Sequence, residues 1–135
     1  MRWTVLPLSI LAVAATGLLL NPRAGAAPPT HEVRVAASQF AFTPELIAVV
    51  AGEPVRLVIH SDDAVHGFAI RELHIDVRIP RGGEPVTVDF TAPPPGRYEV
   101  TCSEFCGKGH VGMKAAIVST APVRTGADRL EEWEF

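Results

Sequence analysis

The sequence predicts an all-β protein, an antiparallel Greek-key β-sandwich or barrel of seven or eight short strands, preceded by an N-terminal hydrophobic segment. Short stretches in which apolar and polar residues alternate recur through the chain, and Gly- and Pro-rich turns separate them. Helical periodicity is scarce. The length of 135 residues suits one domain, and a hydrophobic content of 47% is enough to form a packed core.

The first 26 residues have the features of an export segment. An apolar run of 18 residues, Trp3 to Leu20, follows Arg2, and as a helix it would cover about 27 Å, just short of a bilayer core. Ala24-Gly25-Ala26 offers a small-x-small cleavage site. We expect residues 1–26 to be a cleaved signal peptide, with a retained membrane anchor as the alternative. Either places the domain outside the cytoplasm, in the periplasm or on the outer face of the cytoplasmic membrane.

A stiff Pro-containing linker is expected at residues 27–32, followed by the domain at residues 33–120 and a charged tail at 121–135. Within the domain, the uniformly apolar stretch at 46–50 suggests a strand covered on both faces. Alternation predicts further strands in which every second residue is buried. They are expected at 33–35, 55–59, 73–79, 86–90, 98–102 and 115–119. In the tail, residues 128–133 could form one or two helical turns.

A short segment near the C-terminus carries most of the chemical information. Cys102, Cys106, His110 and Met113 form the pattern C-x3-C-x3-H-x2-M, and these are the only two cysteines in the chain. Soft sulfur donors together with imidazole select copper over calcium, magnesium or manganese. Two thiolates four residues apart can bridge two copper ions, each of which then needs a terminal imidazole. His110 supplies one of these.

The second imidazole has to come from elsewhere in the chain, and His66 is the best candidate. It follows the apolar stretch 55–59 and is expected on a loop that leaves this strand. Gly67 would let the backbone pass close to the metal, and Phe68 would help to exclude water. His31, His60 and His74 are expected in the linker or on polar faces, and we do not assign them to the site.

The segment from Val33 to Ser119 resembles the CuA cupredoxin domain of cytochrome c oxidase subunit II. The matching pieces are His66-Gly67-Phe68-Ala69-Ile70, Pro94-Pro95-Gly96-Arg97-Tyr98 and Cys102-Ser103-Glu104-Phe105-Cys106-Gly107, with His110 and Met113. The CuA domain of nitrous oxide reductase is similar but usually carries Trp between the cysteines, so Glu104 favours the oxidase type. Where oxidase members usually have tryptophan near the domain start, this chain has Gln39-Phe40-Ala41-Phe42, and Phe40 or Phe42 is expected to take its steric role.

The resemblance implies a centre of two copper ions. Cys102 and Cys106 bridge them, His66 and His110 are terminal ligands, and Met113 and the backbone carbonyl of Glu104 are weak ligands. It also implies a magnesium ion at the Glu104 side chain in an oxidase complex. Electrons would come from cytochrome c and pass to the haem of the membrane-bound catalytic subunit, and this chain itself would make or break no bonds.

Charge and donor chemistry limit the alternatives. Residues 27–135 hold ten Lys and Arg against fifteen Asp and Glu, a net charge of −5, which argues against nucleic acid and suits a basic protein partner. A disulfide remains an alternative for two cysteines in an exported protein, whereas structural zinc would not use Met113. Other possible functions are a standalone exported CuA electron carrier and a periplasmic copper carrier or chaperone.

Overall fold

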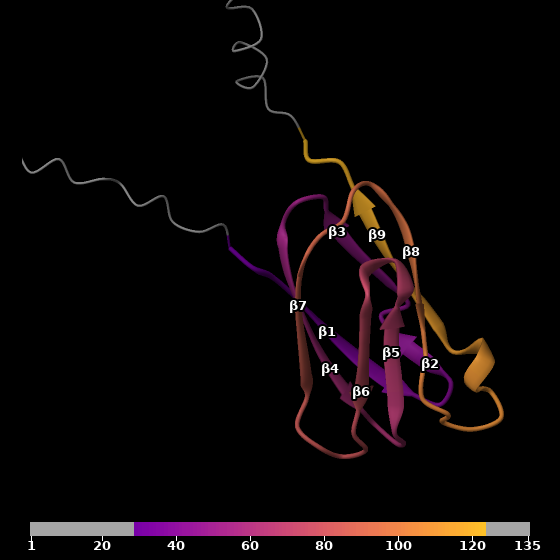
Figure 1. The fold of residues 1–135 in the computed structure, drawn as a ribbon. Coiled ribbons are helices and arrows are strands. Elements are labelled where there is room, and N and C mark those ends of the chain that lie inside the picture. Colours follow the sequence, from indigo (N-terminus) through magenta and orange to yellow (C-terminus); the bar gives the residue numbers. More distant parts are fainter. Residues whose placement is uncertain (1–28, 124–135) are drawn as a thin grey trace, which may run out of the picture.

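A computed structural model describes residues 29–123 as a sandwich of two β-sheets (Figure 1). The expected signal or anchor segment at 1–26 and the helical turns at 128–133 lie outside the described residues. Two 3-10 turns, η1 (Arg71–Leu73) and η2 (His110–Gly112), are the helical elements of the described part. Residues 29–123 form nine strands, which are β1 (His31–Ser38), β2 (Ala41–Thr43), β3 (Leu46–Val50), β4 (Pro54–Ser61), β5 (His66–Ile70), β6 (Ile75–Ile79), β7 (Val86–Thr91), β8 (Gly96–Thr101) and β9 (Lys114–Thr120).

The two sheets have four and five strands, in the orders β2-β1-β4-β7 and β3-β9-β8-β5-β6. Most neighbouring strands are antiparallel, but β1 pairs with β4 in parallel and β3 pairs with β9 in parallel. The expectation of an all-β sandwich is therefore confirmed, whereas the expectation of a wholly antiparallel arrangement is wrong. Parallel partners cannot be joined by a tight hairpin, and here β2 and β3 lie between β1 and β4 in the chain.

Alternating strands build the core from both sheets. In β4, the side chains of Val55, Leu57 and Ile59 are buried, as the alternation predicts, while Arg56 and His60 are exposed. Between the sheets, the rings of Phe42 and Phe68 meet edge to face with their centroids 5.4 Å apart. Buried side chains packed in this way resist small displacements, so the sandwich is a rigid support for the loops at its ends.

Three local expectations differ from the structure. In β3, Leu46 and Val50 are exposed while Ile47 and Val49 are buried, so this strand is covered on one face only, because its other face points away from the second sheet. The stretch at 73–79 becomes a strand only from Ile75, since His74 turns the chain with φ 56°. His31, expected in the linker, starts β1, and its Nδ1 donates a 2.7 Å hydrogen bond to Oε1 of Glu53.

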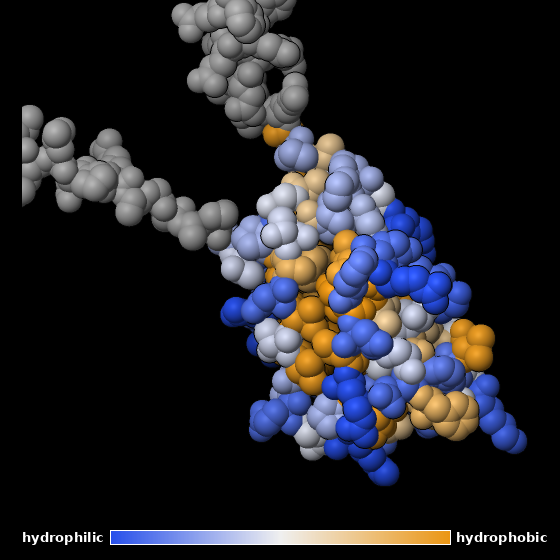
Figure 2. Space-filling view, viewed as in Figure 1, coloured by the Kyte–Doolittle hydropathy of each residue, from blue (hydrophilic) through white to orange (hydrophobic). Residues whose placement is uncertain are grey.

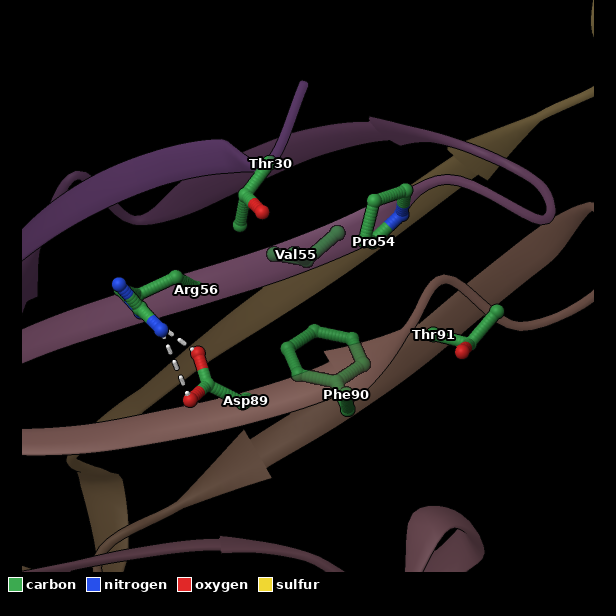
Figure 3. A pocket seen from close by; sticks show the side chains of 7 residues that line it. All are labelled: Thr30, Pro54, Val55, Arg56, Asp89, Phe90 and Thr91. Atoms are coloured by element: carbon green, nitrogen blue, oxygen red, sulfur yellow. Dashed lines mark hydrogen bonds and ion pairs between the residues drawn. The ribbon is translucent and has the colours of Figure 1, made fainter. Parts of the chain in front are cut away.

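The face shown in Figure 2 has an apolar centre over β7, β4 and β6, surrounded by hydrophilic side chains. Val77 in β6 and Val86 and Phe90 in β7 are partly buried and pack against the core. A pocket of about 320 Å³ lies beside the first residues of β4 (Figure 3). Its rim carries the ion pair of Arg56 and Asp89, at 2.7 Å, and its lining has neither thiol nor imidazole. None of the residues expected to bind copper is among its lining residues: His66 begins β5, and the others come after β8.

Candidate metal centre

Strand β8 delivers the first thiol, as the alternation predicts. Val100 and Cys102 are both buried, and Cys102 comes directly after the last residue of the strand. The loop then returns Cys106 so that the two Sγ atoms lie 3.6 Å apart, and both cysteines are free. The amide of Cys102 donates a 3.2 Å hydrogen bond to the carbonyl of Met113, which closes the loop at its base.

His66 meets these thiols from the neighbouring strand. It is the first residue of β5, not part of a preceding loop as the sequence suggested, and its side chain is fully buried. Its Nδ1 atom lies 4.0 Å from Cys102 Sγ. One ligand atom from each of His66, Cys102 and Cys106 falls within 4.8 Å of the others. Two segments 36 residues apart thus converge on one point.

The other ring nitrogen of His66 is held by a residue that the sequence analysis missed. Nε2 lies 2.9 Å from Asp63 Oδ1. Because a carboxylate accepts, this contact assigns the hydrogen to Nε2 and leaves the Nδ1 lone pair free to face the thiols. The sequence signal was available in the acidic pair Asp62-Asp63 before His66, but it does not say which carboxylate turns inward.

Met113 and Glu104 complete the surroundings of the sulfurs. Met113 is fully buried, with Sδ 3.8 Å from Cys106 Sγ. The carbonyl oxygen of Glu104 lies 3.1 Å from Cys102 Sγ. The Glu104 side chain turns instead to the surface, where Oε1 is 4.0 Å from Arg78 Nε. The backbone and side chain of Glu104 therefore face different environments.

His110 lies in η2 and is outside the three-residue group of His66, Cys102 and Cys106. Its Nδ1 atom is buried and has no hydrogen-bond partner among the described residues. Leaving a buried polar atom unpaired is costly, and a metal ion at this atom would remove that cost. The ring lies near Phe105, with centroids 5.9 Å apart.

Close packing fixes the ligand loop onto the sheets. A Cβ atom on Gly67 would stand 2.6 Å from the backbone nitrogen of Glu104. The sequence analysis expected this glycine to make room for the metal, and the structure shows that it makes room for the ligand loop. On the other side, the ring of Phe40 packs against Gly107 and Gly109. Phe42 is buried in the core, so of the two expected residues Phe40 is the one that contacts the loop.

The electrostatics of the site favour a protonated Cys106 thiol in the absence of a metal. Burial raises the pKa of the Cys106 thiol to about 11, and its hydrogen bond with Cys102 and the charge of Cys102 add to the rise. The pKa of Asp63 is lowered, first by the amide of Gln39 and then by His66. A metal cation would displace the thiol protons and pair with the resulting thiolates.

The donor set fits copper. Two thiols, a thioether and imidazoles are soft or intermediate donors, and His110 Nδ1, buried without a hydrogen-bond partner among the described residues, is a further candidate donor. The remaining histidines are engaged at the surface: His60 pairs with Asp62 at 3.1 Å and His31 with Glu53 at 2.7 Å. His74 is exposed in its turn.

No helix among residues 29–123 is long and apolar enough to span a bilayer.

Comparisons with known proteins agree with this arrangement. A family model described as a cupredoxin-like domain matches residues 9–113. A cytochrome c oxidase subunit 2 of Thermus thermophilus is 36% identical over 91 residues, which is 67% of this chain and 67% of that protein. The subunit 2 of a Synechocystis species is 36% identical over 90 residues, 60% of this chain but 26% of the longer relative.

Solved structures show the same fold. A heme-copper terminal oxidase dimer contains a chain with a TM-score of 0.60 and 27% identity, over 67% of this chain and 65% of that one. The periplasmic domain of cytochrome oxidase subunit II from Bradyrhizobium japonicum gives a TM-score of 0.61 at 18% identity, over 76% and 89%. With the family model covering most of its length, and with subunits 2 of cytochrome c oxidase among its relatives, this chain belongs to the cupredoxin-like family.

Proposed function

We propose that this chain is an electron-transfer domain of the CuA type, acting as subunit II of a cytochrome c oxidase. The observation that carries the proposal is the convergence of two free thiols, 3.6 Å apart, with the Nδ1 of His66 at 4.0 Å. Similarity to subunits 2 of cytochrome c oxidase supports the oxidase assignment. When bound, a pair of copper ions supplies one-electron redox chemistry shared between two metals.

Six residues would hold the metals. Cys102 and Cys106 are the proposed bridges, and His66 and His110 the terminal ligands. Met113 and the Glu104 carbonyl are the weak ligands, in line with their positions 3.8 Å from Cys106 Sγ and 3.1 Å from Cys102 Sγ. The exposed Glu104 carboxylate is available as a magnesium ligand where a catalytic subunit would dock.

The protein contributes rigidity and insulation. Phe68, two residues after His66 in β5, and Met113, with Sδ 3.8 Å from Cys106 Sγ, are fully buried and would help to exclude water from the metals. Because the ligand loop is packed against Gly67 and Phe40, its donors cannot easily shift when the metal charge changes. A small change in geometry is what fast electron transfer requires, and the chain needs no acid, base or nucleophile for this role.

Electrons would enter beside His110. Phe105 and Val111 are 79% and 83% exposed and flank this histidine, so they offer apolar contact area to a redox partner. The net charge of −5 over residues 27–135 suits a basic donor such as cytochrome c. In this account the domain is exported and works in the periplasm or on the outer face of the membrane.

Electron paramagnetic resonance of the copper-loaded protein tests the proposal. The oxidised wild type should hold two copper ions per chain and show hyperfine coupling to both nuclei. Cys106→Ser should retain at most one copper, with coupling to a single nucleus, because a hydroxyl does not replace a bridging thiolate. A wild type with one copper and single-nucleus coupling would instead identify a copper carrier.

A further inference from the structure

Asp63 contacts two separate segments of the chain with its two carboxylate oxygens. Oδ1 lies 2.9 Å from Nε2 of His66, and Oδ2 accepts a 2.7 Å hydrogen bond from the backbone amide of Gln39. His66 begins β5, and Gln39 lies in the turn between β1 and β2. One carboxylate therefore fastens a candidate metal ligand to a turn in the opposite sheet.

Gln39 extends this connection to the ligand loop. While its backbone amide bonds Asp63, its side-chain amide donates a hydrogen bond to the carbonyl oxygen of Cys106. The neighbouring amide of Asp62 donates to the carbonyl of Ala37 at 3.0 Å, which fixes the turn before His66 to β1. The contacts run without a break from His66 through Asp63 and Gln39 to Cys106.

The burial of His66 makes the contact with Asp63 decisive for the ring. The imidazole is fully buried and Asp63 is the partner that the structure gives to Nε2, so loss of the carboxylate would remove the contact that holds this side of the ring. With Nε2 held by Asp63, Nδ1 is directed at Cys102 Sγ. Without the carboxylate, the hydrogen could move to the other nitrogen and the ring could rotate, and either change would remove the free lone pair from the side of the thiols.

We propose that Asp63 is a positioning residue of the metal centre: its carboxylate sets the tautomer and orientation of His66 and, through Gln39, locks that ligand to the loop that carries Cys106. The inference deepens the proposed function and rests on it only in treating His66 as a copper ligand. The centre is thus shaped before the metal arrives, by a residue that does not bind the metal.

Asp63→Ala removes both contacts, and Asp62→Ala is its matched control. Asp62 carries the same charge one residue earlier, but its side chain pairs with His60 at the surface. Asp63→Ala should weaken copper binding by about 10- to 100-fold, measured by competition with a Cu(I) chelator. Asp62→Ala should leave the affinity within about twofold of the wild type. Equal affinities for the two variants would overturn the proposal.

Nitrogen-15 NMR of the copper-free protein gives a readout that a merely structural role would not move. The shifts of His66 should show hydrogen on Nε2 in the wild type and in Asp62→Ala, and a changed tautomer in Asp63→Ala. Weaker copper binding in Asp63→Ala with an unchanged His66 tautomer would contradict the positioning role. The measurement needs no copper, so it tests this inference separately from the proposed function. A wild type that binds only one copper would refute the dinuclear centre but not the role of Asp63 in positioning His66.

Asp63→Asn and Gln39→Ala test the contacts separately: the first removes the contact of Asp63 with the Gln39 amide, and the second removes the contact of the Gln39 side chain with Cys106. The asparagine oxygen can still accept from Nε2 of His66, but its amide cannot accept from the Gln39 amide. Asp63→Asn should therefore restore the His66 tautomer and part of the copper affinity, and it decides the question if Asp63→Ala fails to fold. Gln39→Ala should keep the tautomer and weaken copper binding less than Asp63→Ala. Failure of Asp63→Asn to restore the tautomer would count against the proposal.

Discussion

The backbone of Gly67 lies directly against Ser103, so that a Cβ atom at Gly67 would stand 2.1 Å from Ser103 Oγ and 2.7 Å from Ser103 N. This approach joins the residue after His66 to the residue after Cys102. The two segments that carry the proposed ligands can approach this closely because position 67 has no side chain.

Gly67→Ala should destabilise the protein, because the methyl group collides with backbone atoms that cannot rotate away. We expect a loss of about 1–3 kcal/mol in the free energy of unfolding, as for other overpacked sites, measured by urea denaturation without copper. Gly112→Ala is the control, since a Cβ there meets nothing within 4 Å. Equal stability of the two variants would show that the segments can move apart at no cost.

His110→Ala should change the copper spectrum, because it removes the buried nitrogen that has no hydrogen-bond partner among residues 29–123. His60→Ala is the comparison: His60 is exposed and bonded to Asp62, and its loss should leave the spectrum unchanged. Optical absorption and paramagnetic resonance of the two loaded variants check this. An altered spectrum for His60→Ala together with an unaltered one for His110→Ala would reverse our ligand assignment.

The stability of the copper-free protein should fall as the pH rises from about 9 to about 11. The pKa of the Cys106 thiol is raised from 9.0 to about 11 in the folded protein, so the unfolded chain loses this proton at a lower pH than the folded one. Proton loss then favours unfolding within this window. Urea midpoints at several pH values check the trend, which should be weaker in Cys106→Ser. A wild-type stability that does not change between these pH values would contradict a raised pKa of the Cys106 thiol.

The same thiol protons should make copper binding depend on pH. Because each thiol must lose its proton to bind a metal, the apparent affinity should rise by about tenfold per pH unit for each proton released. Competition with a Cu(I) chelator measures this dependence between pH 6 and 8. We choose this range because it lies below the Cys106 pKa of both the unfolded chain, 9.0, and the folded protein, about 11. Affinity independent of pH would mean that copper binds without displacing thiol protons.

Phe105→Ala should slow electron uptake from cytochrome c without changing copper content. The side chain is 79% exposed next to His110, so its loss removes contact area with the partner and little folding energy. We expect a second-order rate about tenfold lower, equivalent to ~1.4 kcal/mol of docking energy. Leu46→Ala, at an exposed position on edge strand β3, should leave the stopped-flow rate unchanged. Equal rates in both variants would place the docking face elsewhere.

Local patterns in the sequence predicted those parts of the structure that depend on neighbouring residues. Alternation placed Val55, Leu57 and Ile59 in the core, and the same reasoning placed Cys102 at the end of a strand. Residue types alone indicated a soft metal site, and the structure brings His66 to both thiols. Whether each residue binds copper stays a prediction.

Features that depend on distant segments could not be read from the sequence. The parallel pairing of β1 with β4 and of β3 with β9 joins strands that local turns do not specify. The exposure of Leu46 follows from its place on the outward face of β3, which a uniformly apolar stretch does not reveal. The contact of Asp63 with Gln39 requires that the two turns be neighbours, so its role became visible only in the folded chain.

Anomalous X-ray diffraction from crystals of the copper-loaded protein tests the central claim most directly, because it locates each metal relative to each sulfur. We predict two copper ions, both bonded to Cys102 Sγ and Cys106 Sγ, with His66 on one and His110 on the other. A single copper ion, or two sulfurs bonded to each other in fully loaded protein, would contradict the account.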